Sequence, residues 1–172
     1  MEKLRKLINI LDKIIEWSGK ICGWLILILT LFVVYEVITR RLMDMPPRWS
    51  FDVTLQLYGG YFMLILAYGL LHNAHVNVDF LYARASARTK AILDIIGYLI
   101  FFYPFCLIVT WKGGIFAAQS WAVKEYSYIG AGLVLYYVKT TIPITGLLLL
   151  IAGTSIFIQR IMVLIKGEGA AI

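Results

Sequence analysis

Cysteine and histidine are scarce in this chain, which contains two of each. Cys22 and Cys106 lie in different apolar runs and lack the Cys-x-x-Cys spacing of thiol-disulfide exchange enzymes. His72 and His75 lie near one helix end, whereas haem ligands in four-helix proteins normally come from facing helices. A Gly-rich phosphate loop, a Ser-His-Asp set and a metal-ligand cluster are also missing. We therefore expect no enzyme activity and no cofactor, and a haem or quinone redox subunit is disfavoured.

Charged residues are scarce too, at 15% of the sequence against about a quarter in soluble proteins, while 61% of the residues are hydrophobic. The run from Val53 to Val78 contains no Asp, Glu, Lys or Arg. A membrane-spanning helix needs roughly 20 mostly apolar residues to cross a hydrocarbon core about 30 Å thick. By that length the sequence predicts an all-α integral membrane protein with four transmembrane spans, over residues 21–40, 53–72, 91–111 and 140–159.

The first residues form a distinct segment. Hydrophobic residues recur at helical spacing over residues 1–19, with Lys6, Asp12, Lys13 and Glu16 largely on the other face. This pattern predicts an amphipathic interfacial helix that lies on the membrane before the first span. A cleaved signal peptide is disfavoured, because about twenty residues with three acids precede the apolar run and no small-residue cleavage pattern follows it. We interpret residues 1–172 as a single membrane domain.

Two prolines predict irregularities in the later spans. Pro104 lies inside the third span, where its missing N–H should kink the helix. The apolar stretch over residues 126–138 is too short to span a membrane. We interpret it as an interfacial segment or as an extension of the fourth helix from about residue 128. Lys139 and Pro143 are then expected to mark a break before the fourth span.

Basic residues are distributed unequally between the two sides of the predicted bundle. The side with both termini and the second loop carries ten Lys and Arg residues, and the opposite loops carry six. Because positively charged loops resist translocation, this difference favours cytoplasmic termini. The net charge of +6 is scattered along the chain, so it indicates contact with lipid headgroups and not with nucleic acid.

Glu36 lies inside the first predicted span, where a buried charge costs about 2.5 to 3.5 kcal/mol on insertion scales. Such a residue could carry a proton or a cation, as in small four-helix multidrug antiporters that use a glutamate in their first span. However, Arg40 follows four residues later, which is the spacing at which opposite charges meet on a helix surface. We therefore favour a structural ion pair, and an autonomous cation- or proton-coupled antiporter is the alternative function.

Two separated groups of polar, aromatic and small residues occur in order along the chain. The first group comprises Glu36, Arg40, Pro47, Trp49, Ala67 to Gly69, His75 to Asp79, and Ser86 to Thr89. The second comprises Trp121, Glu125 to Ser127, Lys139, Pro143 and Gly146. Their order and spacing resemble the small membrane subunit, of the DctQ type, of the tripartite ATP-independent periplasmic (TRAP) transporters. The chain departs from the family at Asp52, a single acid where many members have a pair.

The resemblance implies a small, non-catalytic membrane subunit of a secondary transporter that imports organic acids, often carboxylates, with a sodium gradient. Its implied partners are membrane lipids, a periplasmic substrate-binding protein and a large multispan membrane subunit that holds the substrate and sodium sites. The small subunit would stabilise the scaffold of the large subunit and help to dock the binding protein. The implied location is the cytoplasmic (inner) membrane of a bacterium or archaeon. The sequence agrees, because it lacks the Gly-rich half-helices that build midplane substrate sites.

The resemblance marks residues for contacts between subunits and not for catalysis. On a helical continuation of the second span, His75 and Asp79 would share a face, and we favour a structural latch over a subunit contact or a proton-coupling role. Lys124 and Glu125 could touch the binding protein, and solvated surface charges are the alternative. The candidate contact residues are Glu36, Arg40, Trp49, His75, Asp79, Trp121, Glu125, Lys139, Pro143 and Gly146.

Glycine pairs and aromatic rings predict how the helices pack and how deep they lie. Gly59-Gly60 is favoured over Gly113-Gly114 as a site of close helix approach, because it lies within a predicted span. Amphipathic rings near the predicted span ends should hold each helix at a constant depth in the membrane. These rings belong to Tyr35, Trp49, Tyr58, Trp111, Trp121 and Tyr126.

Overall fold

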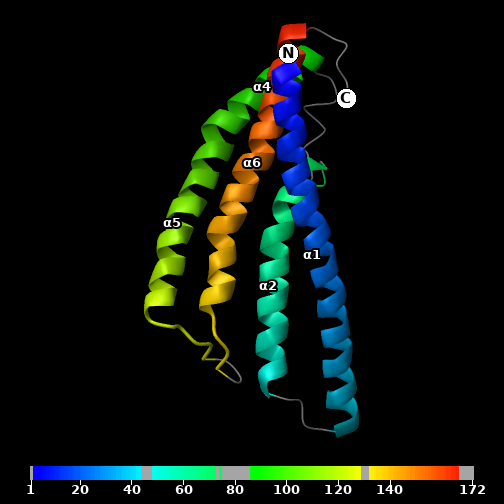
Figure 1. The fold of residues 1–172 in the computed structure, drawn as a ribbon, viewed down its shortest axis with the longest axis vertical. Helices are drawn as coiled ribbons and strands as arrows, with labels where there is room; N and C mark the ends of the chain where they lie inside the picture. Colours follow the sequence, from blue (N-terminus) through cyan, green and yellow to red (C-terminus); the bar gives the residue numbers. More distant parts are fainter. Residues whose placement is uncertain (1, 44–47, 73, 75–85, 129–131, 167–172) are drawn as a thin grey trace.

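Helices make up nearly all of the computed structural model, which describes residues 2–43, 48–72, 74, 86–128 and 132–166. The first two helices form a hairpin, the next three elements follow one another in a single rod, and the last helix returns beside that rod (Figure 1). The elements are α1 (Glu2–Met43), α2 (Arg48–Leu71), α4 (Ala87–Gly97), the π-helical turn η1 (Tyr98–Phe102), α5 (Tyr103–Ala122) and α6 (Tyr136–Lys166).

Four helical stretches are long and apolar enough to cross a membrane. They run over Leu4–Leu42, Trp49–Leu71, Arg88–Ala122 and Tyr136–Ile165. This confirms the all-α membrane architecture with four spans. The side of the membrane on which the termini lie stays a prediction.

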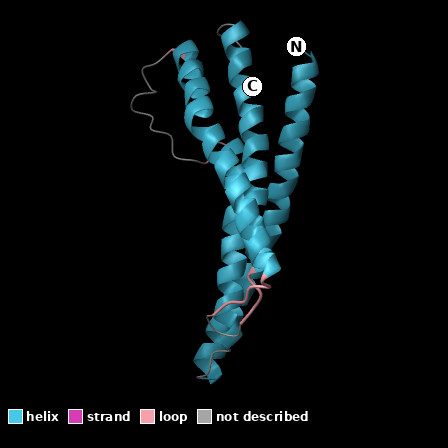
Figure 2. Ribbon diagram, turned by 90° about the vertical axis from the view of Figure 1, so that its left-hand side faces the viewer, coloured by secondary structure: helices cyan, strands magenta, loops and turns pink. Residues whose placement is uncertain are grey.

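The last helix, α6, contacts every other helical element of the described chain. It packs most extensively against α5 and α2, and it also contacts α1, α4 and η1. The other extensive contact is between α1 and α2, so α2 and α6 join two helix pairs into one bundle (Figure 1). Figure 2 shows that the helices cross in the middle of the molecule and fan apart towards the end that carries both termini.

The amphipathic segment over residues 1–19 is not a separate element, because α1 continues through it into the first span without interruption. No proline lies within α1, and the Ser18 hydroxyl donates to the Ile15 carbonyl at 2.8 Å instead of capping a new helix. Gly19 allows close packing, since a Cβ there would lie 2.0 Å from the Tyr68 ring. Contact with the bundle therefore carries the helix straight through this glycine.

The irregularity predicted at Pro104 is a π-helical turn that directly precedes it. The Tyr103 N–H donates to the Tyr98 carbonyl five residues earlier, and η1 ends there. Pro104 cannot donate a hydrogen bond, so a wider turn relieves the contact of its ring with the preceding turn of helix. The helix continues through the proline, and the third span runs on to Ala122, eleven residues beyond the predicted end at residue 111.

The predicted break at Lys139 and Pro143 is wrong, because α6 begins at Tyr136 and runs through both residues. Pro143 lies where α6 packs closely on α5, since a Cβ at Gly113 would lie 3.4 Å from the Pro143 nitrogen. Two hydroxyls of the same turns donate to backbone carbonyls, Thr140 to Tyr136 at 2.7 Å and Thr141 to Val138 at 2.6 Å. The fourth helix is also not extended from residue 128. The described residues between α5 and α6 are a loop with one isolated antiparallel bridge, between Tyr126 and Val134.

Small residues bring α5 and α6 together, and the glycine preference from sequence is wrong. A Cβ at Gly59 would meet nothing within 4 Å, and one at Gly60 would meet only Thr141 at 3.9 Å. A Cβ at Gly113 would instead lie 2.7 Å from Ile142, and one at Gly146 would lie 2.3 Å from the Thr110 hydroxyl. Gly113 became a packing residue because α5 extends past the predicted span end.

We predict that Gly146→Ala destabilises the protein, because the added methyl would also lie 3.0 Å from the Thr110 backbone nitrogen, which cannot move without the helix. Overpacking of this kind costs about 1 to 3 kcal/mol. Thermal unfolding in detergent micelles measures the effect. Gly114→Ala is the matched control on α5, where a Cβ meets nothing within 4 Å, and its Tm should stay unchanged or rise. Equal loss of stability in both variants would contradict the packing assignment.

Candidate functional site

The polar candidates gather at the end of the bundle opposite the termini, where the α5–α6 loop meets α2. We call the group Asp52, Trp121, Glu125, Ser127 and Lys139 the loop cluster. Its members come from α2, the end of α5, the loop and the start of α6. The cluster therefore holds α2, which is distant in the sequence, to the continuous stretch that runs from the end of α5 through the loop to the start of α6.

Backbone hydrogen bonds shape the loop that carries Glu125 and Ser127. After α5 ends, the Glu125 N–H donates to the Ser120 carbonyl at 3.0 Å, and Lys124 takes a positive φ of 47°. The two sides of the loop then pair, since the Ser127 N–H donates to Leu133 at 2.7 Å and the Leu135 N–H donates to Glu125 at 2.9 Å. The loop thus has a defined shape of its own.

Glu125 and Lys139 form an ion pair across the loop. The Lys139 ammonium also lies 4.2 Å from the centre of the Phe116 ring, a cation–π contact with α5. The hydrogen bond from Lys139 is the main cause that lowers the pKa of the Glu125 carboxyl below its usual range, and the Ser120 side chain adds to it. Lys139 therefore joins α5, the loop and α6 through one side chain.

Asp52 ties the loop to α2. Its side chain is buried, with 2% of the residue exposed, and its carboxylate accepts a hydrogen bond from the Ser127 hydroxyl at 2.9 Å. A buried carboxylate is costly unless hydrogen-bonded, so this contact is a strong constraint on the loop. Asp52 stood out in the sequence only as a departure from the family pattern, and its role as the link to α2 was missed.

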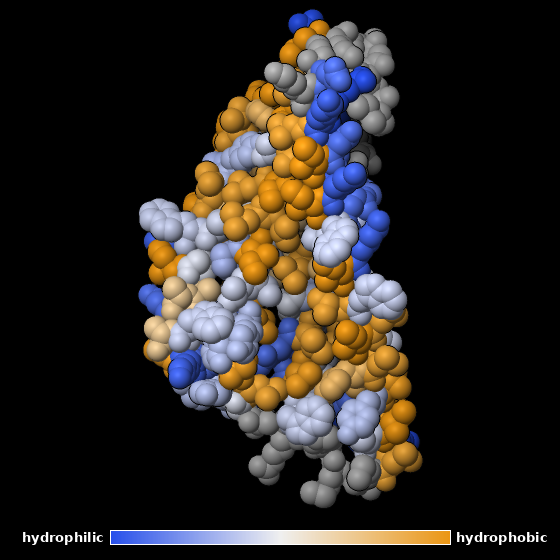
Figure 3. All heavy atoms as spheres, in the orientation of Figure 1, coloured by the Kyte–Doolittle hydropathy of each residue, from blue (hydrophilic) through white to orange (hydrophobic). Residues whose placement is uncertain are grey.

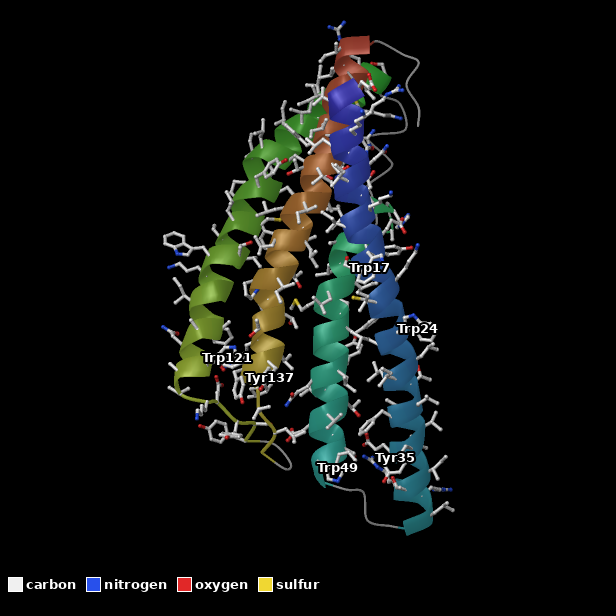
Figure 4. The ribbon with its side chains drawn as sticks, viewed as in Figure 1. Trp17, Trp24, Tyr35, Trp49, Trp121 and Tyr137 are labelled. Carbon is white, nitrogen blue, oxygen red and sulfur yellow. The ribbon has the colours of Figure 1, made fainter. Side chains whose placement is uncertain are left out.

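Aromatic rings cover the cluster where α5 meets α6. The Trp121 ring N–H donates to the Thr140 hydroxyl at 2.9 Å. The same ring lies 4.4 Å from the Tyr136 ring and 5.2 Å from the Tyr137 ring, between centroids. Figure 4 shows Trp121 and Tyr137 side by side at this end of the pair of helices. Trp121 is thus both a hydrogen-bond donor and part of an aromatic group, and its predicted role in subunit contact stays a prediction.

The predicted ion pair in the first span is confirmed. Arg40 lies 3.0 Å from one carboxylate oxygen of Glu36, and the Thr54 hydroxyl donates to the other oxygen at 3.2 Å. Glu36 therefore joins α1 to α2 and has both of its oxygens engaged. Trp49 lies close by, with its ring stacked on that of Tyr35 at 6.5 Å between centroids (Figure 4).

A second set of polar contacts ties the helices at the end that carries the termini. Asp12 on α1 accepts a hydrogen bond from the buried Ser155 on α6. Glu16 lies 2.8 Å from His72, which connects α1 with the end of α2, and Arg160 on α6 lies 3.0 Å from Asp94 on α4. Sequence reasoning missed these contacts, although the acids on the polar face of residues 1–19 were a usable signal.

The remaining sequence candidates divide into two groups. Pro143 and Gly146 lie on the face of α6 that packs against α5, so both belong to the helix interface and not to the loop cluster. His75 and Asp79 lie outside the described residues, and the latch proposed for them stays a prediction.

The chemistry of the site is that of fixed contacts. Within the described part of the chain, no group of three or more His, Cys, Asp or Glu side chains lies close enough together to hold a metal ion. The charged members of the loop cluster are paired with each other or hydrogen-bonded within the chain. The arrangement can join helices and present a shaped loop.

The family model for the DctQ component of the tripartite ATP-independent periplasmic transporters matches residues 29–162. That match covers α2 to the final turns of α6 and about the last third of α1. A comparison with curated proteins found no match.

The Glu125–Lys139 pair should make stability depend on pH. Because the folded-state pKa of Glu125 is lowered, its contribution is complete above the unfolded value of about 4.3 and is lost as the pH falls through the folded value. We predict that Glu125→Gln lowers Tm at pH 7 and that the difference from wild type shrinks towards zero as the pH falls below about 4.

Thermal unfolding in detergent between pH 7 and pH 3.5 checks this prediction. Lys124→Gln is the adjacent control, because Lys124 is exposed and should show no such pH-dependent difference. A Glu125→Gln effect that does not change with pH would show that the ion pair is not its cause.

Proposed function

The chain belongs to the DctQ component family of the TRAP transporters, and from this membership we propose that it stabilises the scaffold of a large membrane subunit. It is a small membrane subunit of a TRAP transporter. In the proposed complex, the large subunit and a periplasmic binding protein carry the substrate and the sodium coupling. The transported substrate is an organic acid, and this chain holds the complex at a constant depth in the inner membrane.

The observation that carries this proposal is the fastening of the helices at both ends. Glu36 with Thr54 and Glu16 with His72 connect α1 to α2 near opposite ends of the pair. The loop cluster then connects α2, α5 and α6 at one end, and Asp12 with Ser155 connects α1 to α6 at the other. Helices joined at both ends resist sliding past one another, and this resistance suits a fixed support for the large membrane subunit.

Aromatic rings at the span ends support a fixed depth in the membrane. Trp49 and Tyr35 lie at the α1–α2 end, and Trp121 lies at the α5–α6 end with Tyr136 and Tyr137 (Figure 4). Such rings favour the headgroup level of a bilayer, with the apolar part of the ring towards the tails. Rings held in groups on several helices would limit vertical movement of the whole bundle.

The environment of Glu36 argues against the alternative of an autonomous antiporter. A carrier carboxylate has to exchange its proton or cation with both sides of the membrane. Glu36 is instead bonded through both oxygens, lies near the end of α1, and has only 12% of its side chain exposed. A carboxylate held in this way has a structural role, because it joins two helices.

Reconstitution into liposomes tests the proposal. We expect no sodium-driven organic-acid uptake from this chain alone, and uptake from the complex of this chain, the large subunit and the binding protein. Glu36→Gln should lower the Tm of the complex and leave the sodium dependence of uptake unchanged, because Glu36 joins helices and carries no ion. Uptake or drug export by the isolated chain that Glu36→Gln abolishes would establish the antiporter instead.

The loop between α5 and α6 suits the docking of the binding protein. Glu125 is engaged with Lys139, whereas Lys124 and Tyr128 are exposed and pair with no acidic side chain in the described part of the loop; Tyr128 is 99% exposed. A fully exposed tyrosine in the same loop as an exposed lysine is typical of a contact surface, since aromatic rings provide much contact area at a low entropic cost. We therefore propose that the loop contributes to docking through Lys124 and Tyr128.

The double variant Lys124→Glu/Tyr128→Ala should lower uptake several-fold when the binding protein is limiting, because an attractive charge and a contact ring are lost. Saturating binding protein should restore much of the rate. The amount of assembled complex and its Tm should match wild type. Lys112→Glu on α5 is the control for a charge reversal elsewhere on the surface. Uptake equal to wild type at every concentration of binding protein would exclude the loop from docking.

A further inference from the structure

Helix α1 packs against the rest of the bundle with a seven-residue period. Ile8, Ile15, Cys22 and Leu29 are its buried hydrophobic residues, and each follows the previous one by seven. A seven-residue repeat is the spacing at which one helix lies along another with a slight left-handed supercoil. The inward face of α1 therefore already has coiled-coil spacing.

A second hydrophobic stripe follows the same period on the outward face of α1. We call it the outer seam; its residues alternate at three and four positions, and every one is exposed. Trp17 and Trp24 are each 70% exposed, and Leu31 is 72% exposed; Figure 4 shows both tryptophans on α1. The outer seam consists of Leu7, Ile10, Ile14, Trp17, Ile21, Trp24, Ile28, Leu31, Tyr35, Ile38 and Leu42.

The outer seam is longer than the hydrocarbon core of a membrane. Residues 7 to 42 rise by about 53 Å in a continuous helix, while a helix tilted by as much as 40° crosses a core of about 30 Å within about 39 Å. The amphipathic pattern predicted that residues 1–19 lie along the membrane surface, but α1 runs through them as one continuous helix. Several turns of the exposed apolar seam therefore extend beyond the acyl chains.

The width of the apolar surface changes along α1. In the spanning half, residues directly beside the seam, such as Leu27 and Val34, are also apolar and exposed, as expected for contact with lipid. In the first half, the exposed residues directly beside the seam include Lys6, Lys13 and Lys20. There the seam comprises two residues of every seven, which is typical of a helix that packs against one other helix. Figure 3 shows this hydrophilic band beside the apolar surface along the upper part of α1.

Three lysines define the charge that a partner helix packed on the outer seam must match. Lys6, Lys13 and Lys20 are exposed and occupy the same position of the seven-residue repeat, directly beside the seam. Charges at this position of a coiled coil meet the flanking residues of the partner and select it. The partner should therefore carry carboxylates at the end that lies beside these lysines.

A second copy of this chain does not supply those carboxylates. Among the described residues of α1, Asp12 and Glu16 bond to α6 and α2, Glu36 bonds to Arg40, and Glu2 pairs with Lys6 on the same helix. In a parallel pair of copies, the lysines would lie opposite Leu11, Ser18 and Leu25, and in an antiparallel pair they would lie opposite apolar residues and Arg41. Self-association would therefore bring no carboxylate of the other copy to these lysines, and Lys6 would keep only Glu2 of its own helix.

We propose that the outer seam of α1 docks one long helix of a different membrane subunit, with apolar residues at three- and four-residue spacing and carboxylates beside Lys6, Lys13 and Lys20. The identification of that subunit as the large subunit rests on the proposed function. The seam itself rests on the period, length and charge of α1. In this arrangement the α1 helix is packed on two sides, with the bundle on one and the partner on the other.

Site-specific photo-crosslinking in the intact complex tests the seam. A photoreactive phenylalanine analogue placed at Ile10, Ile14 or Trp17 should crosslink to the large subunit. The matched controls, Asn9 and Gly23, are exposed on the same helix but lie away from the seam, and they should crosslink at least about fivefold less. Crosslinks from the seam only to lipid, within the chain or to a second copy would overturn the proposal, as would equal yields at all five positions.

Charge reversal gives an independent readout. Lys13→Glu/Lys20→Glu should reduce co-purification of the large subunit at least about fivefold, because carboxylates would then face carboxylates. Lys112→Glu, an exposed control on α5, should retain it, and circular dichroism and Tm of the isolated variants check that each folds. Retention of the partner by the folded double variant would overturn the charge-matching part.

The two hypotheses fail in different ways. If the wild-type chain never co-purifies with a large subunit, the proposed scaffold function fails. If the complex forms but the seam crosslinks only to lipid, the function stands and the seam assignment fails.

Discussion

Polar groups in a chain that lies mostly in hydrocarbon have to be bonded within the protein or brought to its ends, and the rest of this structure depends on that constraint. The charged contacts between helices lie towards the two ends of the bundle, with Glu36 and the loop cluster at one and Asp12, Glu16 and Asp94 at the other. Between them the core consists of small and aliphatic residues such as Ala67, Cys106 and Ala152. The polar contacts set the relative positions of the helices, and the apolar middle allows them to pack closely.

The same constraint explains how α6 can serve as the common partner of the other helices. A proline in its first turns leaves the Lys139 carbonyl without its usual N–H donor, yet α6 continues through it where it packs closely on α5. Gly146 and Gly153 then let side chains of α5 and η1 approach the backbone of α6 closely. In α1, the constraint acts through length: a helix longer than the membrane is thick needs cover for its apolar residues beyond the acyl chains, and the bundle covers one side only.

Several elements could be predicted from local sequence because their cause is local. The four spans follow from uncharged length, and the Glu36–Arg40 pair follows from a spacing of four on one helix. The predictions that were wrong involved competition between a local signal and packing. Pro143 is a helix-breaking signal in a segment that packs closely on α5 and stays helical, and Gly59-Gly60 lies within a span but faces no neighbour that needs the space. Asp52 and Ser127 are 75 residues apart, so no local pattern announced their bond.

By itself, the sequence determined the solvent of this protein, the number of its spans and its family, because hydropathy, length and motif order are properties of the chain alone. Only the tertiary structure decided which polar residues meet, since partners such as Glu16 and His72 come from different helices whose relative rotation is set by packing. It also decided that the amphipathic start continues into the first span as one helix. That continuity turned a pattern suited to the membrane surface into an exposed apolar seam, because the bundle takes up only one face of α1.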